Sequence, residues 1–232
     1  MAVLLVQSKA GGASSQTATA TLDSTPTQGN LLIAVISWVT NGSIATAPAG
    51  WTEAKFAGGA THGFLVIYYK VAGASEPTNP AWTAASTAVC HISLFEYSGL
   101  TATPLDKVAS AGPSFVSTIG TGTTAAIAQA DELLFAAVAT PEVTRTFSNT
   151  WANSFTRVLL NGRHQTAALV VSSVATYATT EAYSANSWGI GVIVTFKIAA
   201  VAGTNSKINI GGVWKTVNSL KQNIGDAWKT IF

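Results

Sequence analysis

An uninterrupted apolar segment near the start of the chain constrains the fold more than any other feature. Residues 29–39 have the sequence GNLLIAVISWV, and residues 131–139, DELLFAAVA, repeat its pattern, with Leu133 corresponding to Leu31 (133 − 31 = 102). Apolar runs of this length, bounded by turn residues and rich in β-branched side chains, are typical of buried central strands. Two such strands without any helical periodicity around them predict an all-β fold.

The segments around these two strands also follow one order twice. A Thr/Ala-rich segment precedes each central strand, and a tryptophan follows it, Trp51 in the first half and Trp151 in the second. The later pairs are residues 62–72 with 164–175 and residues 82–97 with 188–198. We therefore predict a jelly-roll-like antiparallel β-sandwich, pseudo-duplicated from two halves. The alternative is that all sandwich halves resemble one another, which removes the duplication and keeps the fold.

The end of the chain contains a tandem repeat. Residues 207–220, KINIGGVWKTVNSL, are followed by residues 221–232, KQNIGDAWKTIF, so that Lys, Asn, Ile, Gly, Trp, Lys and Thr recur with a period of 14. Each copy places Gly-Gly or Gly-Asp between two short strands, which is typical of a two-residue hairpin turn, and the two hairpins could join into a four-stranded meander. We divide the chain into a β-sandwich body (1–200), a linker (201–206) and a C-terminal hairpin repeat (207–232).

This repeat is too small to cover its own apolar side chains. Its two tryptophans carry on the order of 8–12 kcal/mol of gross burial, at roughly 150–250 Å² each and about 25 cal/mol/Å². The body of the same chain, other copies of the repeat or a different protein must cover them. We expect the repeat to drive assembly into a homo-oligomer, with a trimer favoured, through Ile208, Ile210, Val213, Trp214, Ile224 and Trp228.

The low charge of the chain supports assembly and argues against nucleic-acid binding. Only 9% of residues are charged and the net charge is +2, so the surface offers little electrostatic protection against association and little attraction for a phosphate backbone. The N-terminus has no basic region before its apolar run, which is too short for a signal peptide or a membrane span. We expect synthesis in the cytoplasm of a host cell and no membrane insertion.

No motif for chemistry stands out. The histidines (His62, His91 and His164) lack metal-ligand spacing, and His62 and His164 begin matching strands, which favours a structural role at a sheet edge. Cys90, in an apolar segment, is expected to be a core thiol. Glycoside hydrolysis needs two carboxylates across a cleft, and Glu96, the best candidate beside Glu53, alternates with apolar residues as on a solvated strand face. We predict no enzyme, no cofactor and no metal.

Loop aromatic residues are the best ligand candidates, because sugar rings stack on exposed aromatic faces. Trp82, Trp188 and Tyr183 form this candidate glycan site. Trp51 and Trp151 occupy equivalent positions in the two halves, which favours plugs at the ends of the core.

The tail is similar to short NIGGxWK-type repeats in virion proteins of tailed bacteriophages. The body segments AVLLVQSKA, GNLLIAVIS, GWT, YYKVA, FEYSGL and GVIVTFK resemble a family of phage and prophage β-sandwich proteins. Together the two similarities cover essentially the whole chain. They imply a structural virion component, such as a tail-tip or fibre protein or a capsid-surface fibre, with other virion proteins as partners and host-surface glycan as a further contact. No catalytic residues come with the resemblance. The alternative function is a carbohydrate-binding adhesin module.

Overall fold

The computed structural model describes residues 2–39, 44–59, 62–141 and 145–200, together with the backbone of four short strands after residue 205. All regular elements in these ranges are β-strands. The chain divides into two compact units, Met1–Ala199 and Ala200–Phe232.

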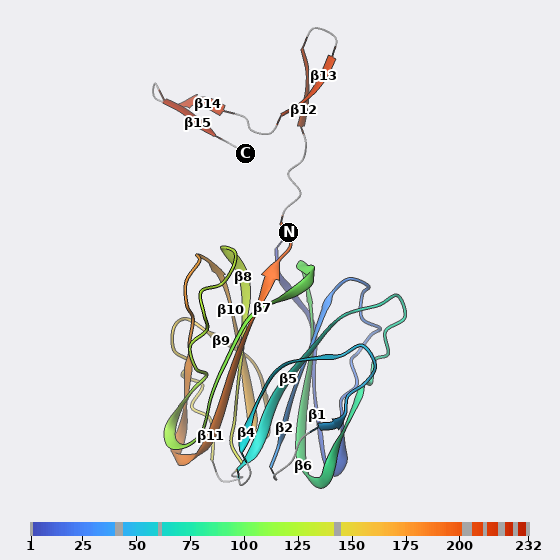
Figure 1. The fold of residues 1–232 in the computed structure, drawn as a ribbon, viewed down its shortest axis with the longest axis vertical. Coiled ribbons are helices and arrows are strands. Elements are labelled where there is room, and N and C mark those ends of the chain that lie inside the picture. Colours follow the sequence, from blue (N-terminus) through green and yellow to red (C-terminus); the bar gives the residue numbers. More distant parts are fainter. Residues whose placement is uncertain are drawn as a thin grey trace. The chain divides into compact units, whose positions relative to one another are not determined.

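The N-terminal half of the body forms one antiparallel sheet (Figure 1). Its strands are β1 (Leu4–Thr19), β2 (Leu31–Trp38), β3 (Ile44–Thr46), β4 (Thr52–Gly59), β5 (Gly63–Val71) and β6 (Ala81–Ser98). They lie in the order β1-β6-β2-β5-β4, and β3 pairs with β6 beside this path.

The C-terminal half of the body forms a second sheet with the same topology. Its strands are β7 (Leu100–Gly120), β8 (Asp131–Ala139), β9 (Thr156–Asn161), β10 (His164–Ser172) and β11 (Thr180–Ile198). The order β7-β11-β8-β10-β9 matches the first sheet strand for strand. Each half of the repeated sequence is thus one sheet, and the predicted antiparallel β-sandwich is confirmed, while its jelly-roll subtype stays a prediction.

The two sheets face each other through alternate residues of their central strands. Leu31, Ile33 and Val35 of β2 share one buried cluster with Leu133 and Phe135 of β8. This cluster is the core between the sheets.

The opposite faces of the central strands are covered as well. Leu32 and Ile36 of β2 belong to a second buried cluster, and Leu134 and Ala136 of β8 to a third. Strands buried on both faces need apolar residues at consecutive positions, which explains why both central segments are uninterrupted apolar runs.

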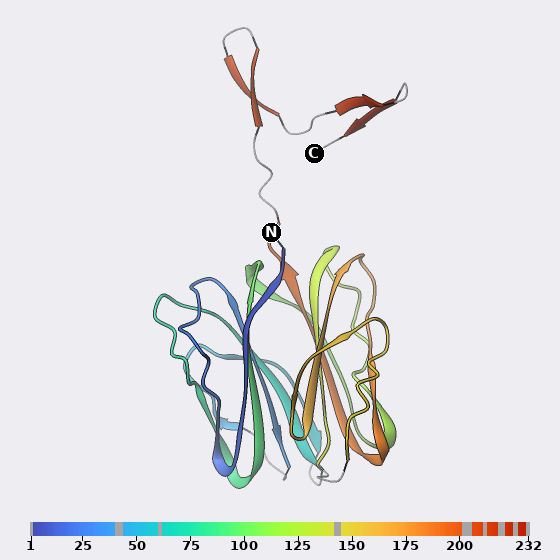
Figure 2. The same ribbon diagram turned by 180° about the vertical axis from the view of Figure 1, so that it is seen from behind.

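The long ribbons β1–β6 and β7–β11 provide much of this cover. β1 and β6 stay paired along their length, and together they double back over their own sheet (Figures 1 and 2). As a result Gly11 lies so close to Thr19 of the same strand that a Cβ atom on Gly11 would collide with the Thr19 carbonyl oxygen. Gly191 meets Gly120 in the same way in the second half. Only glycine permits such close backbone approach.

The C-terminal unit contains two separate two-stranded sheets rather than one four-stranded meander. Their strands are β12 (Ser206–Ile210), β13 (Val213–Val217), β14 (Lys221–Ile224) and β15 (Ala227–Thr230). The backbone register places Asn209 opposite Trp214 and Asn223 opposite Trp228, at the same point of each repeat. The side chains of the predicted docking residues and most of the linker lie outside the described part of the chain.

Candidate functional site

Trp82 lies in the interior, which corrects its assignment to a glycan-binding surface. Its side chain is 0% exposed, and its ring meets Trp51 edge-on at a centroid distance of 4.9 Å and Tyr68 at 5.9 Å. The returning part of the β1–β6 ribbon carries Trp82 onto the covered face of the first sheet. A sugar ring therefore has no access to it.

Tyr183 is also buried, so it is not a sugar platform either. Its hydroxyl donates a hydrogen bond to the carbonyl oxygen of Ala139 at 3.0 Å, and its ring packs against Phe147 at 5.1 Å. Burial raises the pKa of the Tyr183 hydroxyl, and the nearby Glu181 raises it further. The residue fastens the segment around Phe147 to β8.

Trp188 keeps part of its surface exposed. His62 stacks on its indole at 3.7 Å with an interplanar angle of 12°, and Phe115, which is 53% exposed, lies at 5.7 Å on the neighbouring strand. Of the three aromatic residues predicted to bind glycan, Trp188 alone remains a surface candidate, with His62 and Phe115 beside it.

Trp51 and Trp151 cover the sheets rather than plugging the ends of the core. Trp51 belongs to the cluster on the face of the first sheet that is turned away from the second. Trp151 packs on the corresponding face of the second sheet, where its indole N–H donates to Gln165 Oε1 at 3.1 Å. Their positions are equivalent, as the repeat predicted. Cys90 is a buried thiol, which confirms its prediction.

A polar link crosses the core between the sheets. Ser37 Oγ of β2 is 2.9 Å from Nδ1 of His164, and Ser93 Oγ of β6 is 2.7 Å from Nε2 of the same ring. Burial and, to a smaller extent, the adjacent His91 lower the pKa of His164 to about 3. The imidazole is neutral at neutral pH and 0% exposed, so this Ser-His arrangement joins two sheets and is closed to a substrate.

His62 and His164 are not equivalent, contrary to the sequence alignment, and His164 is not at a solvated edge. Even-numbered residues of β5, such as Phe64, face away from the second sheet, whereas those of β10, such as Ala168, face the first sheet. An offset of 102 therefore does not align β5 with β10 face for face, and His62 itself lies in the turn before β5, where it stacks on Trp188 of the second sheet. Ser37 was the feature of the sequence that could have predicted the contact with His164, because a polar residue inside a buried apolar strand needs a hydrogen-bond partner.

The edge of the second sheet is tied to the first beside this link. The Asn161 side-chain amide donates to the carbonyl oxygens of Gly11 at 2.8 Å and Ile92 at 2.7 Å. An open groove of about 400 Å³ lies here, lined mainly by small residues together with His91 and Asn161. Burial lowers the pKa of His91, and the charge of Arg163 lowers it as well. The hydrogen bond between His91 and Asn161 acts in the opposite direction and raises the pKa.

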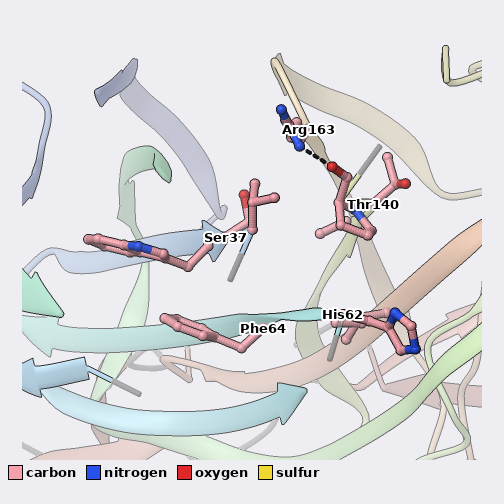
Figure 3. A pocket seen from close by; sticks show the side chains of 10 residues that line it. Ser37, His62, Phe64, Thr140 and Arg163 are labelled. Atoms are coloured by element: carbon pink, nitrogen blue, oxygen red, sulfur yellow. Dashed lines mark hydrogen bonds between the residues drawn. The ribbon is translucent and has the colours of Figure 1, made fainter. Parts of the chain in front are cut away.

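A small cavity lies at the other end of the link (Figure 3). Ser37, His62, Thr140 and Arg163 contribute to its lining, and its volume is about 10 Å³. The Arg163 guanidinium donates to the carbonyl oxygen of Pro141, which also lines the cavity. A space of this size holds at most one water molecule, so it is not a ligand site.

Glu96 is buried, which corrects its assignment to a solvated strand face. Its side chain is 1% exposed and accepts hydrogen bonds from the Thr27 N–H at 2.8 Å, the Asn30 amide at 2.5 Å and the Gln7 amide at 2.6 Å. It therefore holds the turn that leads into β2. A carboxylate used in this way is not available as a catalytic acid or base.

Other buried carboxylates fix loops in the same way. Asp106 accepts from the Ala128 N–H at 2.6 Å in the turn before β8, and Glu181 accepts from the Asn149 N–H at 2.6 Å. Burial tends to raise the pKa of Asp106, but hydrogen bonds from Lys107 and Ala128 outweigh it and the pKa falls. The neighbouring Glu132 is 0% exposed, and burial raises its pKa, so this carboxyl pair has no route to a substrate.

Searches for related proteins and for general site signatures add nothing to this geometry. Comparison of the chain with protein-family models, with curated proteins and with solved structures finds no match. Among the described residues, no three His, Cys, Asp or Glu side chains group closely enough to hold a metal ion. The same part of the chain contains no helix with the length and hydropathy needed to cross a membrane.

Proposed function

We propose that this protein is a non-enzymatic structural component of a bacteriophage virion, a tail-tip, fibre or capsid-surface protein that assembles through its C-terminal repeat. The tandem repeat carries the proposal. Two short ribbons with the same register follow a separate body, and each places a tryptophan at the same position. A repeated apolar unit of this size needs a cover from outside itself.

The body supports this function because its buried polar groups serve its own structure. Both faces of its central strands are buried, and its interior carboxylates and its Ser-His contacts hold loops and sheets in place. It is a self-sufficient domain suited to display on a particle. Its low content of charged residues, 9%, fits a surface that is partly covered by neighbours.

The mass in solution tests the assembly role. Light scattering should give a fixed oligomer for the full chain, with a trimer expected, and a monomer for a chain that ends at Ala199. Equal masses for the two proteins would remove the repeat as the assembly device. A monomeric full chain would count against assembly without partners and would direct the search to other virion proteins.

Contact with host-surface glycan is the second candidate function, and the half-exposed Trp188 favours it. Phe115 beside it is exposed, so the pair offers aromatic surface to a sugar. Trp188→Ala should then abolish binding on a glycan array, while a protein with unchanged binding would exclude this surface.

A further inference from the structure

An open groove lies where β4 and β5 of the first sheet meet β7 and β11 of the second. Its volume is about 350 Å³, at the lower end of the range for small-molecule sites. The side chains that matter for its chemistry are Thr52, Tyr69, Lys70, Thr103, Pro104 and Lys197. Unlike the groove beside His91, whose lining residues are mostly small, this one combines an aromatic ring, hydroxyl groups and ammonium groups.

One of its two lysines is already neutralised. Lys70 Nζ is 2.7 Å from Glu76 Oε1 and donates to the Ala49 carbonyl oxygen at 3.2 Å. The Glu76 side chain is only 4% exposed and also accepts from the Gly73 N–H, so this ion pair is a fixed part of the groove wall. Lys70 therefore contributes shape rather than net charge.

Lys197 is the available cation of the groove. Within the described ranges it forms no ion pair, and it is half-buried at the end of β11. Its cross-strand neighbour Glu132 is fully buried with a raised pKa, which favours the uncharged acid. Glu53, next to Thr52, receives the hydroxyl hydrogen of Tyr68 on the other face of the sheet. The groove thus presents one positive charge.

Tyr69 gives the groove an aromatic wall with a polar edge. Its ring is half-buried and packs on Phe196 at 5.9 Å, which fixes its orientation. Among the described residues its hydroxyl has no hydrogen-bond partner, and the hydroxyls of Thr52 and Thr103 are exposed nearby. An aromatic face with several free hydroxyl groups suits the apolar face and the hydroxyl rim of a sugar ring.

We propose that this groove binds a sugar that carries a carboxylate, with the sugar ring against Tyr69 and the carboxylate at Lys197. The inference rests on the proposed contact with host-surface glycan and adds a second site, separate from Trp188, whose class of ligand is an acidic saccharide. A nucleic-acid backbone needs several cations along its path, whereas this groove has a single one.

Two probes that differ in the carboxylate test the proposal on the full chain. Sodium glucuronate and glucose are titrated separately, and binding is followed by ligand-observed NMR. We expect glucuronate to bind roughly tenfold more tightly than glucose, and Lys197→Gln to remove this preference, as for a hydrogen bond to a charged group. Lys9→Gln, on β1 at the opposite edge of the first sheet, is the matched control and should leave binding unchanged.

Further variants separate recognition from folding. Tyr69→Phe keeps the ring and should retain most of the binding, while Tyr69→Leu should lose it. A thermal melt of each variant checks the fold. If Tyr69→Leu is unstable, Lys197→Gln, at a half-buried strand end, decides whether the groove binds the sugar.

Three results would overturn the proposal: no binding of glucuronate, equal binding of the two probes, or equal competition by inorganic phosphate, which indicates a general anion site. Light scattering on the same samples separates the groove from the assembly role, because an intact oligomer without sugar binding leaves assembly standing. Glycan binding that is lost in Trp188→Ala and kept in Lys197→Gln rejects the groove and leaves the contact at Trp188.

Discussion

His164 shows how one residue can couple the stability of the sandwich to pH. Its pKa is about 3 in the folded protein and close to the ordinary 6.5 in the unfolded chain. Between these values the unfolded state binds a proton that the folded state excludes. Stability is therefore complete above pH 6.5 and falls by about 1.4 kcal/mol for each pH unit as the pH drops toward 3.

Urea denaturation at pH 7, 6 and 5 measures this slope. His164→Gln removes the titrating group, so its free energy of unfolding should change less with pH than that of the unaltered protein. A small slope should remain, because the lowered pKa of His91 acts in the same direction. Identical slopes in the two proteins would show that His164 does not control the acid sensitivity.

Glu96 makes a second prediction at the scale of single residues. Glu96→Ala leaves the Thr27 N–H and the Asn30 amide without their acceptor, and should cost roughly 2–4 kcal/mol in the free energy of unfolding. Asp131→Ala, at an exposed position, should change stability by less than about 0.5 kcal/mol. Chemical denaturation of both variants provides the comparison, and similar small losses would mean that Glu96 is not a loop anchor.

The sequence misplaced Glu96 for a physical reason. Alternation along a strand predicts which residues share a face, but it does not reveal whether that face meets water or another segment. The cover over Glu96 comes from the turn at Thr27, 69 positions away in the chain. Ser37, by contrast, did carry a usable signal, since it interrupts an apolar central strand.

At the scale of elements, the central strands were the most predictable part of the fold. Consecutive apolar residues in β2 and β8 require burial on both faces, and the structure provides it. The repeated order of segments predicted a duplicated sandwich, and the structure adds that each half forms one sheet with the same strand order. The return of the β1–β6 ribbon was not predictable, because it depends on glycines such as Gly11 that a strand pattern alone would assign to turns or bulges.

The returning ribbon predicts different costs for two tryptophans that the sequence treated alike. Trp82→Ala empties a fully buried site between Trp51 and Tyr68 and should cost about 3–5 kcal/mol. Trp188→Ala removes a ring that is partly in water and should cost clearly less. Thermal melts of the two variants test this difference. If Trp82→Ala loses glycan binding and also melts at a lower temperature, the loss of binding reflects lost folding.

At the scale of the whole molecule, the boundary between the two units separates stability from assembly. The body contains its own buried clusters, all drawn from residues before Ala199. The sequence foresaw a separate tail from its repeat and composition. The partner that covers the tail could not be predicted, because it depends on a second surface that the repeat itself does not specify.

Replacing both tail tryptophans in the full chain tests this separation. Trp214→Ala with Trp228→Ala removes the largest apolar groups of the repeat but leaves the body untouched, so the mass by light scattering should fall to that of a monomer. Thermal melts at equal protein concentration should give the same melting temperature for the double variant and for a chain that ends at Ala199. Neither change reaches the buried clusters of the body. An oligomer that survives the double substitution would place the assembly surface on the sandwich, and its exposed strand edges would then become the contacts to examine.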